Sequence, residues 1–166
     1  MHAITEWLQN LPLPEELIAF IVSMLPIVEL RGGIPIAAIM GIDFLPALGL
    51  CVAGNLLPIP FILLLIIPLF GWMKTTKLFR PIAEKLEKRT LSKRDQLEKG
   101  EFWGLMIFVG IPLPGTGAWT GAFLAALLGI KFKKAIVAII CGVLIAAAIM
   151  SIIFYAFPSL FTMLFL

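Results

Sequence analysis

The stretch PIVELRGGIP, Pro26 to Pro35, predicts the fold of the chain. It places Glu29 and Arg31 in the middle of an apolar region, and Gly32 and Gly33 follow directly. A charged pair inside hydrophobic sequence is costly in a membrane and by default marks a functional site. Proline and glycine favour a break in the helix, which persists at membrane depth only where it is buried or lines a cavity. The stretch therefore predicts a broken helix that carries a polar site within a membrane.

The composition predicts an all-α integral membrane protein. Of the 166 residues, 61% are hydrophobic and 14% are charged, whereas a soluble domain carries about 25% charged residues. Two stretches, Phe44–Met73 and Ala135–Leu166, contain no charge at all. Each is longer than the roughly 20 apolar residues that span a bilayer.

Residues suited to covalent chemistry are scarce in this sequence. Cys51 and Cys141 both lie in apolar segments, where cysteine serves as a small packing residue. The single histidine is His2, and no nucleotide-binding loop, metal-ligand cluster or nucleophile–base set is present in the sequence. We therefore expect no enzyme activity, no metal and no cofactor.

The first break predicts a re-entrant hairpin over residues 15–42. The uncharged run Leu17–Val28 would rise only about 18 Å as a helix, and Ile34–Ile42 is shorter still. Two such limbs joined by LRGG would enter and leave the membrane on the same side. The alternative is a single kinked span from Glu15 to Gly41.

A second break, IPLPGTGAWTGA at Ile111–Ala122, predicts a second re-entrant hairpin over residues 101–130. Each hairpin precedes a full transmembrane helix, which we place at 44–72 and 132–157. The first of these helices contains Pro58 and Pro60 and should be kinked.

The three predicted regions of the chain follow from these elements. Residues 1–73 form a first repeat that begins with an interfacial helix at 1–10, and residues 100–166 form a second repeat. Between them, residues 74–99 hold nine Lys/Arg against four Asp/Glu. Their helix formers and Glu-to-Lys pairs at helical spacing predict an amphipathic helix on the cytoplasmic surface.

The distribution of basic residues predicts the orientation. All 13 except Arg31 lie between Lys74 and Lys134. If the second hairpin re-enters, segments 74–99 and 131–134 share one side, which the positive-inside rule makes the cytoplasm. The N-terminus and the first hairpin then lie outside.

The two halves also resemble each other in sequence. A shift of 88 residues gives nine identities in 29 positions. Because one half starts outside and the other inside, the repeat would be inverted, which is a recurrent plan among transporters with broken helices. The matched pairs are Pro26/Pro114, Gly33/Gly121, Ala37/Ala125, Ala38/Ala126, Gly41/Gly129, Ile42/Ile130, Phe44/Phe132, Ala47/Ala135 and Gly54/Gly142.

The predicted substrate site lies where the two hairpin tips would meet near the bilayer centre. Helix limbs that start after Gly33 and after Gly117 would point their N-termini there, which favours anions. Arg31 adds a fork of donors suited to phosphate, and Glu29 could pair with Arg31 or take up a proton. The predicted substrate-binding residues are Glu29, Arg31, Gly32, Gly33, Asn55, Thr116, Gly117, Trp119 and Thr120.

Alternatives remain open for several of these residues. Glu29 and Arg31 could form a buried ion pair that only holds the hairpin together. Asn55 could hydrogen-bond a neighbouring helix instead of lining a pathway. Trp119 could be a packing residue.

The pattern PxxELRGGIPxA followed by PLPGTGAWTGA resembles the small multi-drug export protein family of bacteria and archaea, over Glu15 to about Phe157. That family looks like a relative of the DedA (VTT, SNARE-associated) superfamily. The resemblance implies a prokaryotic cytoplasmic (inner) membrane and a flippase for an anionic lipid carrier, undecaprenyl phosphate, with proton coupling through Glu29. DedA proteins carry arginines in the second hairpin, whereas IPLPGTGAW has none.

The sequence is compatible with three functions. The first is the polyprenyl-phosphate transporter, the second an exporter of small or drug-like solutes, and the third a structural or assembly membrane protein. Two spans and two hairpins enclose little, so we expect a homodimer, with Gly121–Ala126 and Cys141–Ala148 as candidate contacts. The expected partner is a membrane lipid and not a nucleic acid.

Overall fold

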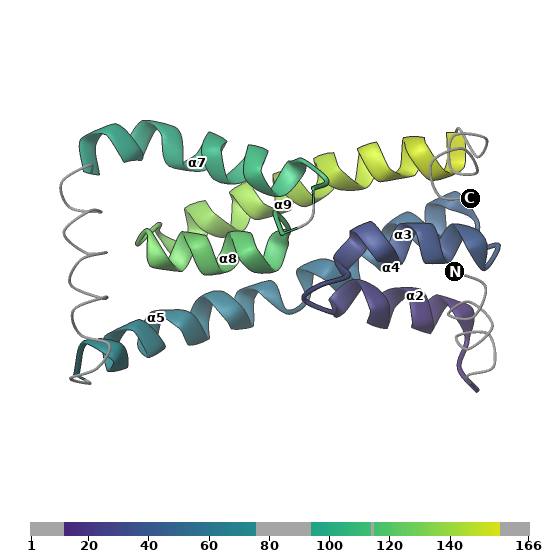
Figure 1. Ribbon diagram of the computed structural model, residues 1–166, viewed down its shortest axis with the longest axis horizontal. Helices are drawn as coiled ribbons and strands as arrows, with labels where there is room; N and C mark the ends of the chain where they lie inside the picture. Colours follow the sequence, from purple (N-terminus) through teal and green to yellow (C-terminus); the bar gives the residue numbers. More distant parts are fainter. Residues whose placement is uncertain (1–11, 76–93, 114, 157–166) are drawn as a thin grey trace. The chain divides into compact units, whose positions relative to one another are not determined.

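The computed structural model describes residues 12–75, 94–113 and 115–156, and within them it contains helices and no strands (Figure 1). The predicted interfacial helix at 1–10, most of segment 74–99 and the residues after 156 lie outside the described residues. The helices are α2 Glu15–Met24, α3 Glu29–Ile39, α4 Phe44–Leu56, α5 Ile59–Thr75, α7 Arg94–Gly110, α8 Ala118–Leu127, α9 Phe132–Ser151 and a π-helical turn, η1, Ile152–Ala156. The predicted all-α class is confirmed.

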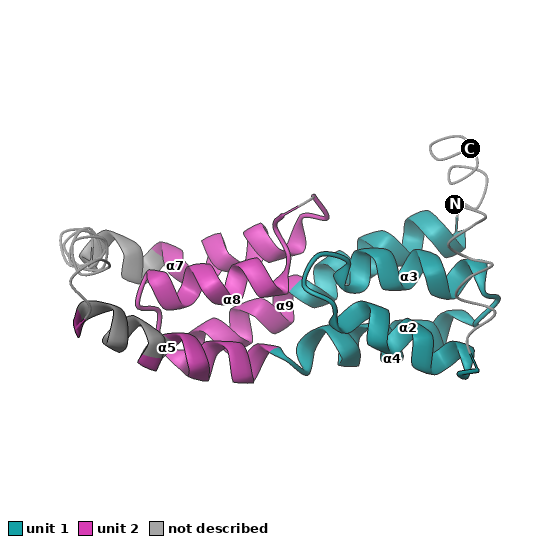
Figure 2. Ribbon diagram, turned by 60° about the horizontal axis from the view of Figure 1, so that its bottom comes forward, with its two compact units in different colours: residues 1–58, 143–166 teal, residues 59–142 magenta. Residues whose placement is uncertain are grey.

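The chain forms two compact units, coloured separately in Figure 2. Unit 1 comprises residues 1–58 and 143–166, and unit 2 comprises residues 59–142. Unit 1 therefore holds α2, α3 and α4 with the second part of α9 and η1. Unit 2 holds α5, α7 and α8 with the first part of α9.

In unit 1, α2 and α3 pack against each other and against α4. Helix α2 begins after Pro14 with Glu15 and Glu16 in its first turn, where the helix dipole favours negative charge. It ends just before Pro26, which has no N–H to continue the helix. With 10 and 11 residues, α2 and α3 each rise about 15–17 Å, half of the roughly 30 Å hydrocarbon core of a bilayer.

The predicted position of the first break is wrong. The turn between the limbs covers residues 25–28, and α3 already begins at Glu29, so LRGG belongs to the helix. The reason is close packing, because a Cβ atom built on Gly33 would clash with the Ser23 hydroxyl of α2. Gly33 brings two helices together instead of separating them.

Both hairpins end in the same left-handed glycine cap. Gly41 has φ 79° and Gly129 has φ 69°, a conformation that glycine adopts without a steric penalty. The following amide of Ile42 donates to the Ala37 carbonyl at 3.0 Å, and that of Ile130 donates to the Ala125 carbonyl at 2.9 Å. This bonding is the Schellman pattern of helix C-termini.

A second pair of matched glycines allows close helix contact. A Cβ atom on Gly54 in α4 would clash with the Phe20 carbonyl oxygen of α2, and one on Gly142 in α9 would lie 2.7 Å from the Met106 carbonyl oxygen of α7. In each case a backbone oxygen fills the space that a side chain would need. Each hairpin thus packs its first limb against the span that follows it.

Unit 2 is built around α8, which contacts both α5 and α7. The prediction that this limb starts directly after Gly117 is confirmed. Lys134 donates to Glu101 Oε2 at 3.0 Å, which links the start of α9 to α7.

The predicted dimer contact over Gly121–Ala126 is wrong in part. Gly121, Ala122 and Ala125 are buried within unit 2. A Cβ atom on Gly121 would clash with the Val109 side chain of α7. This small-residue face is therefore already covered inside the chain.

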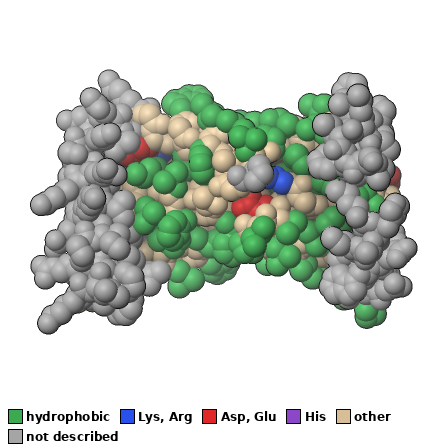
Figure 3. All heavy atoms as spheres, viewed as in Figure 1, with side chains coloured by type: hydrophobic (Ala, Val, Ile, Leu, Met, Phe, Trp, Pro, Cys, Tyr) green, Lys and Arg blue, Asp and Glu red, His purple; other side chains and the backbone are tan. Residues whose placement is uncertain are grey.

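Two helical stretches, Phe44–Ile66 and Phe132–Ala156, are long and apolar enough to cross a membrane. The first is interrupted between α4 and α5 by a turn at Leu57 and Pro58, where the kink was predicted. Large apolar side chains are exposed along both stretches. On the face shown in Figure 3, hydrophobic side chains prevail and few charged side chains are visible.

Candidate functional site

Three neighbouring helices of unit 1 each bury one polar side chain in an otherwise apolar core. Ser23 lies on α2, Glu29 on α3 and Asn55 on α4. The Ser23 hydroxyl donates to the Ala19 carbonyl at 2.8 Å and is therefore satisfied within its own helix. Glu29 and Asn55 remain as the candidates for a polar site.

The helix register places Glu29 opposite Asn55. A Cβ atom on Gly33 would lie 3.2 Å from Cys51 Sγ, which pairs these two positions across α3 and α4. The two helices follow each other through a short turn and run antiparallel. Glu29 lies one turn before Gly33 in α3, and Asn55 lies one turn after Cys51 in α4. Both side chains therefore lie at one level, on the faces that the two helices bury against each other.

Glu29 is held in an unusual backbone conformation. It is 4% exposed, and its φ of 54° is the only left-handed value among the described non-glycine residues. This conformation costs an L-residue about 1–2 kcal/mol, and such strain is concentrated at functional sites. Its first position in α3 puts the carboxylate near the positive end of the helix dipole.

Arg31 lies in the same helix turn and is partly exposed. The Glu29 carboxylate acts electrostatically on its guanidinium group, and that the two side chains form an ion pair stays a prediction. A buried carboxylate needs such a partner, because an isolated charge in an apolar interior is strongly destabilised. The guanidinium group, being partly exposed, can also reach a ligand with its several donors.

Gly32 and Gly33, two of the predicted substrate-binding residues, lie inside α3, and that they bind substrate stays a prediction. The Gly32 N–H donates to the Val28 carbonyl at 3.1 Å and is used inside the chain. The reason is that α3 begins at Glu29, so Gly32 and Gly33 lie within the helix and not before its first turn. Both glycines act in packing.

Asn55 is the clearest sign of an incomplete polar site. It is 1% exposed, and within the described part of the chain neither its Oδ1 nor its Nδ2 has a hydrogen-bond partner. The alternative of a hydrogen bond to a neighbouring helix is wrong for the part of the chain that the structure describes. A buried amide without partners costs about 1–3 kcal/mol, so its retention needs a functional reason.

Replacing Asn55 with valine is expected to stabilise the protein by about 1–2 kcal/mol, because two unsatisfied polar atoms leave an apolar site. The 88-residue shift between the two halves pairs Asn55 with Val143, so valine occupies the corresponding position of the second half. Thermal unfolding in detergent measures the gain. A loss of stability would show that Asn55 serves the packing of the fold.

The predicted residues of the second hairpin all lie in unit 2, at the start of α8. The Thr116 hydroxyl donates a shared hydrogen bond to the Ile111 and Leu113 carbonyls, at 2.8 and 2.9 Å, and so closes the turn. Gly117 is buried, Trp119 is partly exposed and Thr120 is exposed. That these residues share one site with Glu29 stays a prediction.

The structure adds residues that the sequence did not indicate. An apolar cavity of about 600 Å³ lies in unit 1 between α4 and the end of α9. Ser151 lines it, and the available signal was that its hydroxyl is the first one in the uncharged segment Ala135–Leu166. No group of three His, Cys, Asp or Glu side chains that could hold a metal occurs among the described residues.

The apolar helices and the buried polar site define a helical membrane protein. Residues 29–149 match the family described as "Putative small multi-drug export protein". The match covers most of the chain and begins at Glu29, and the protein belongs to this family. None of the curated proteins and none of the solved structures with which the chain was compared matches it.

Proposed function

We propose that this protein is a membrane transporter whose substrate carries an anionic group that binds at Arg31. The observation that carries the proposal is Glu29, a buried carboxylate in a strained left-handed conformation beside a partly exposed arginine. Glu29 orients and partly neutralises the guanidinium group, and the opposing amide of Asn55 supplies further hydrogen-bonding capacity. The protein makes and breaks no covalent bonds in this proposal.

The proposal includes two re-entrant hairpins. Exposed apolar residues at both turns support it, since Ile27 is 95% exposed and Leu113 is largely exposed. Such turns would be unfavourable in water but suit the interior of a bilayer. The half-length helices α2, α3 and α8 are too short to cross it.

The proposal also includes an inverted repeat. The matched glycine caps at Gly41 and Gly129 and the matched close contacts at Gly54 and Gly142 support it. At these two glycine pairs, the identities found with the 88-residue shift fall on positions with the same local geometry. With the basic residues on the cytoplasmic side, the N-terminus lies outside the cell.

The first substrate candidate is undecaprenyl phosphate, moved across the cytoplasmic membrane of a prokaryote. Its phosphate suits the guanidinium fork, and its hydrocarbon chain can remain in the lipid while the headgroup crosses at the hairpins. Glu29 would take up a proton when the headgroup leaves. The relationship to the DedA superfamily, from which this candidate comes, is part of the proposal.

The second candidate is export of small or drug-like solutes through the same architecture. The description of the family favours it. Such solutes would also use Arg31 if they are anionic, so the two candidates differ in the substrate and not in the site. We also propose that the protein functions as a homodimer.

Binding to undecaprenyl phosphate tests the proposal. Purified protein in nanodiscs should bind the lipid saturably, and Arg31→Ala should weaken binding about 10- to 100-fold through loss of charge-assisted hydrogen bonds. Lys133→Ala is the matched control, because Lys133 is an exposed cation outside the hairpins. Equal binding by wild type and Arg31→Ala would contradict the lipid-carrier function, and Arg31-dependent binding of an anionic dye alone would favour the second candidate.

A further inference from the structure

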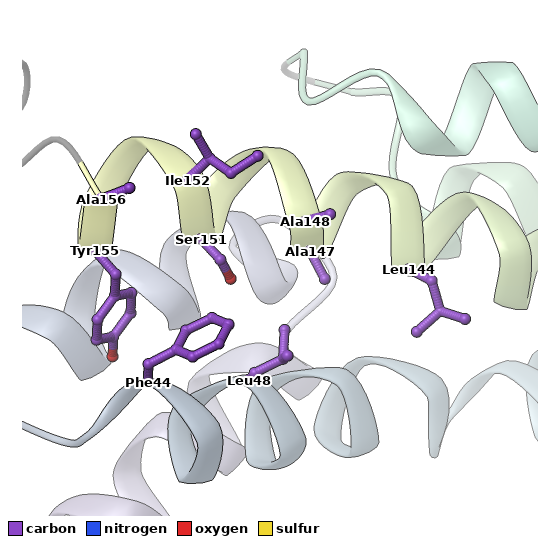
Figure 4. A pocket seen from close by; sticks show the side chains of 9 residues that line it. All are labelled: Phe44, Leu48, Leu144, Ala147, Ala148, Ser151, Ile152, Tyr155 and Ala156. Carbon is purple, nitrogen blue, oxygen red and sulfur yellow. The ribbon is translucent and has the colours of Figure 1, made fainter.

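Unit 1 contains a groove that is separate from the polar site around Glu29. Its residues come from the start of α4 and from the second part of α9 with η1 (Figure 4). Ala147 and Ser151 form its buried floor, and Phe44, Leu144 and Ile152 form an exposed rim. Its volume of about 600 Å³ falls within the range of about 300–1,000 Å³ that is typical of ligand sites.

The mouth of the groove is held open by fixed contacts. The Tyr155 hydroxyl donates to the Ile42 carbonyl at 2.9 Å. The rings of Phe44 and Tyr155 pack edge to face with centroids 5.5 Å apart. The π-helical turn η1 carries Ile152, Tyr155 and Ala156 to the groove, and such turns often occur at functional sites. The groove is therefore preformed.

A polar side chain, Ser151, lies on the floor of this apolar groove. Ser151 is 6% exposed, and its hydroxyl has no hydrogen-bond partner among the residues that the structure describes. Figure 4 shows its oxygen pointing from α9 toward Phe44, into the space between the helices. A serine in a helix usually satisfies its hydroxyl on a carbonyl of the preceding turn, as Ser23 does. The hydroxyl of Ser151 is thus available for an acceptor that the groove receives.

The length of the groove matches one leaflet of a bilayer. From Leu144 to Ala156 the helix rises about 18 Å, close to half of the roughly 30 Å hydrocarbon core. Asp43, a charged residue that directly precedes α4, would lie at the membrane interface at the Phe44 end because charge is costly inside the bilayer. Ser151 then lies about one turn below the interface, at the depth where the ester carbonyls of glycerolipids are found.

We infer that the groove binds one acyl chain of an ester-linked membrane lipid, with the Ser151 hydroxyl donating to the ester carbonyl. The chain lies along Ala147 and Ala148 toward Leu144, and the headgroup stays beside Asp43 and Tyr155. This lipid is a bound component of the protein and not its cargo, so the inference goes beyond the proposed transport function. It depends only on the second transmembrane stretch spanning the membrane.

Native mass spectrometry tests the site by comparing the wild-type protein with a variant in which a larger side chain fills the groove. Wild-type protein purified with dioleoyl phosphatidylglycerol should retain one lipid per chain. Ala148→Trp, which fills the groove, should lower that occupancy at least about fivefold. Ile145→Trp is the matched control, because Ile145 is exposed on the same helix but does not line the groove.

A second comparison tests the role of Ser151. Wild-type protein should bind the diester lipid about 2- to 10-fold more tightly than the matching diether lipid, which lacks the carbonyl acceptor. Ser151→Ala should bind both lipids equally. A variant that fails to fold would lose all lipids. Loss of the preference for the diester lipid, with binding of both lipids retained, therefore requires a folded protein and a specific hydrogen bond.

Three outcomes would overturn the inference. The first is unchanged lipid occupancy in Ala148→Trp. The second is conversion of a dimer into monomers by Ala148→Trp without loss of lipid, which would assign the groove to a second copy. The third is a rise in lipid occupancy on removal of residues 157–166, which would assign it to that apolar segment.

Discussion

Glu29→Gln is expected to lower transport at least about 30-fold while the protein still folds and inserts. The substitution keeps the shape of the side chain but removes the charge that orients Arg31. Removing one partner of a closely paired charge costs about 2–5 kcal/mol of binding. Transport of the labelled substrate into proteoliposomes measures the effect, and circular dichroism with size-exclusion chromatography measures folding.

The double variant Glu29→Gln/Arg31→Met separates a transport site from a structural ion pair. Replacing both charges of a buried pair is often neutral for stability, whereas removing one is destabilising. If the pair only holds the hairpin, the double variant should recover both folding and transport. If it forms the substrate site, the double variant should fold and remain inactive, which is the result we expect.

Gly54→Ala is expected to destabilise the protein by about 1–3 kcal/mol or more. The added Cβ atom would clash with the Phe20 carbonyl oxygen and would lie 3.3 Å from Ser23 Cβ. A backbone oxygen cannot rotate away, so α2 must shift from α4, and overpacking of this kind is costly. Thermal unfolding in detergent, followed by intrinsic fluorescence, measures the change.

Gly49→Ala is the control for this substitution, because it lies in the same helix with no atom within 4 Å of an added Cβ. It should be neutral or slightly stabilising, since alanine favours the helix over glycine. Gly142→Ala in α9 should behave like Gly54→Ala, with the Met106 carbonyl oxygen as the obstacle. Equal stability of Gly54→Ala and Gly49→Ala would disprove the close contact of α2 with α4.

Much of the fold could be predicted from local features of the sequence. The short limbs, the kink near Pro58 and the start of α8 after Gly117 follow from residues that act on their own backbone. Proline removes a donor and glycine permits left-handed turns, whatever surrounds them. The glycines that match between the two halves could be recognised in the sequence for the same reason.

The position of the first break could not be predicted in this way. Gly32 and Gly33 suggested a turn, yet they lie inside α3 because neighbouring side chains need the space that they leave. A glycine that permits a turn and a glycine that permits close packing look identical in a sequence. Only the position of Ser23 on the adjacent helix distinguishes the two.

By itself, the sequence determined that this protein is helical and apolar, that more than half of its charged residues lie in segment 74–99, and that Glu29 and Arg31 lie within an apolar region. These properties follow from composition and from each residue's effect on its own backbone. The tertiary structure decided that Asn55 is buried with no hydrogen-bond partner among the described residues and that Ser151 faces an open groove. Both depend on the packing of α4 against other helices, and such contacts between distant residues leave no local pattern in the chain.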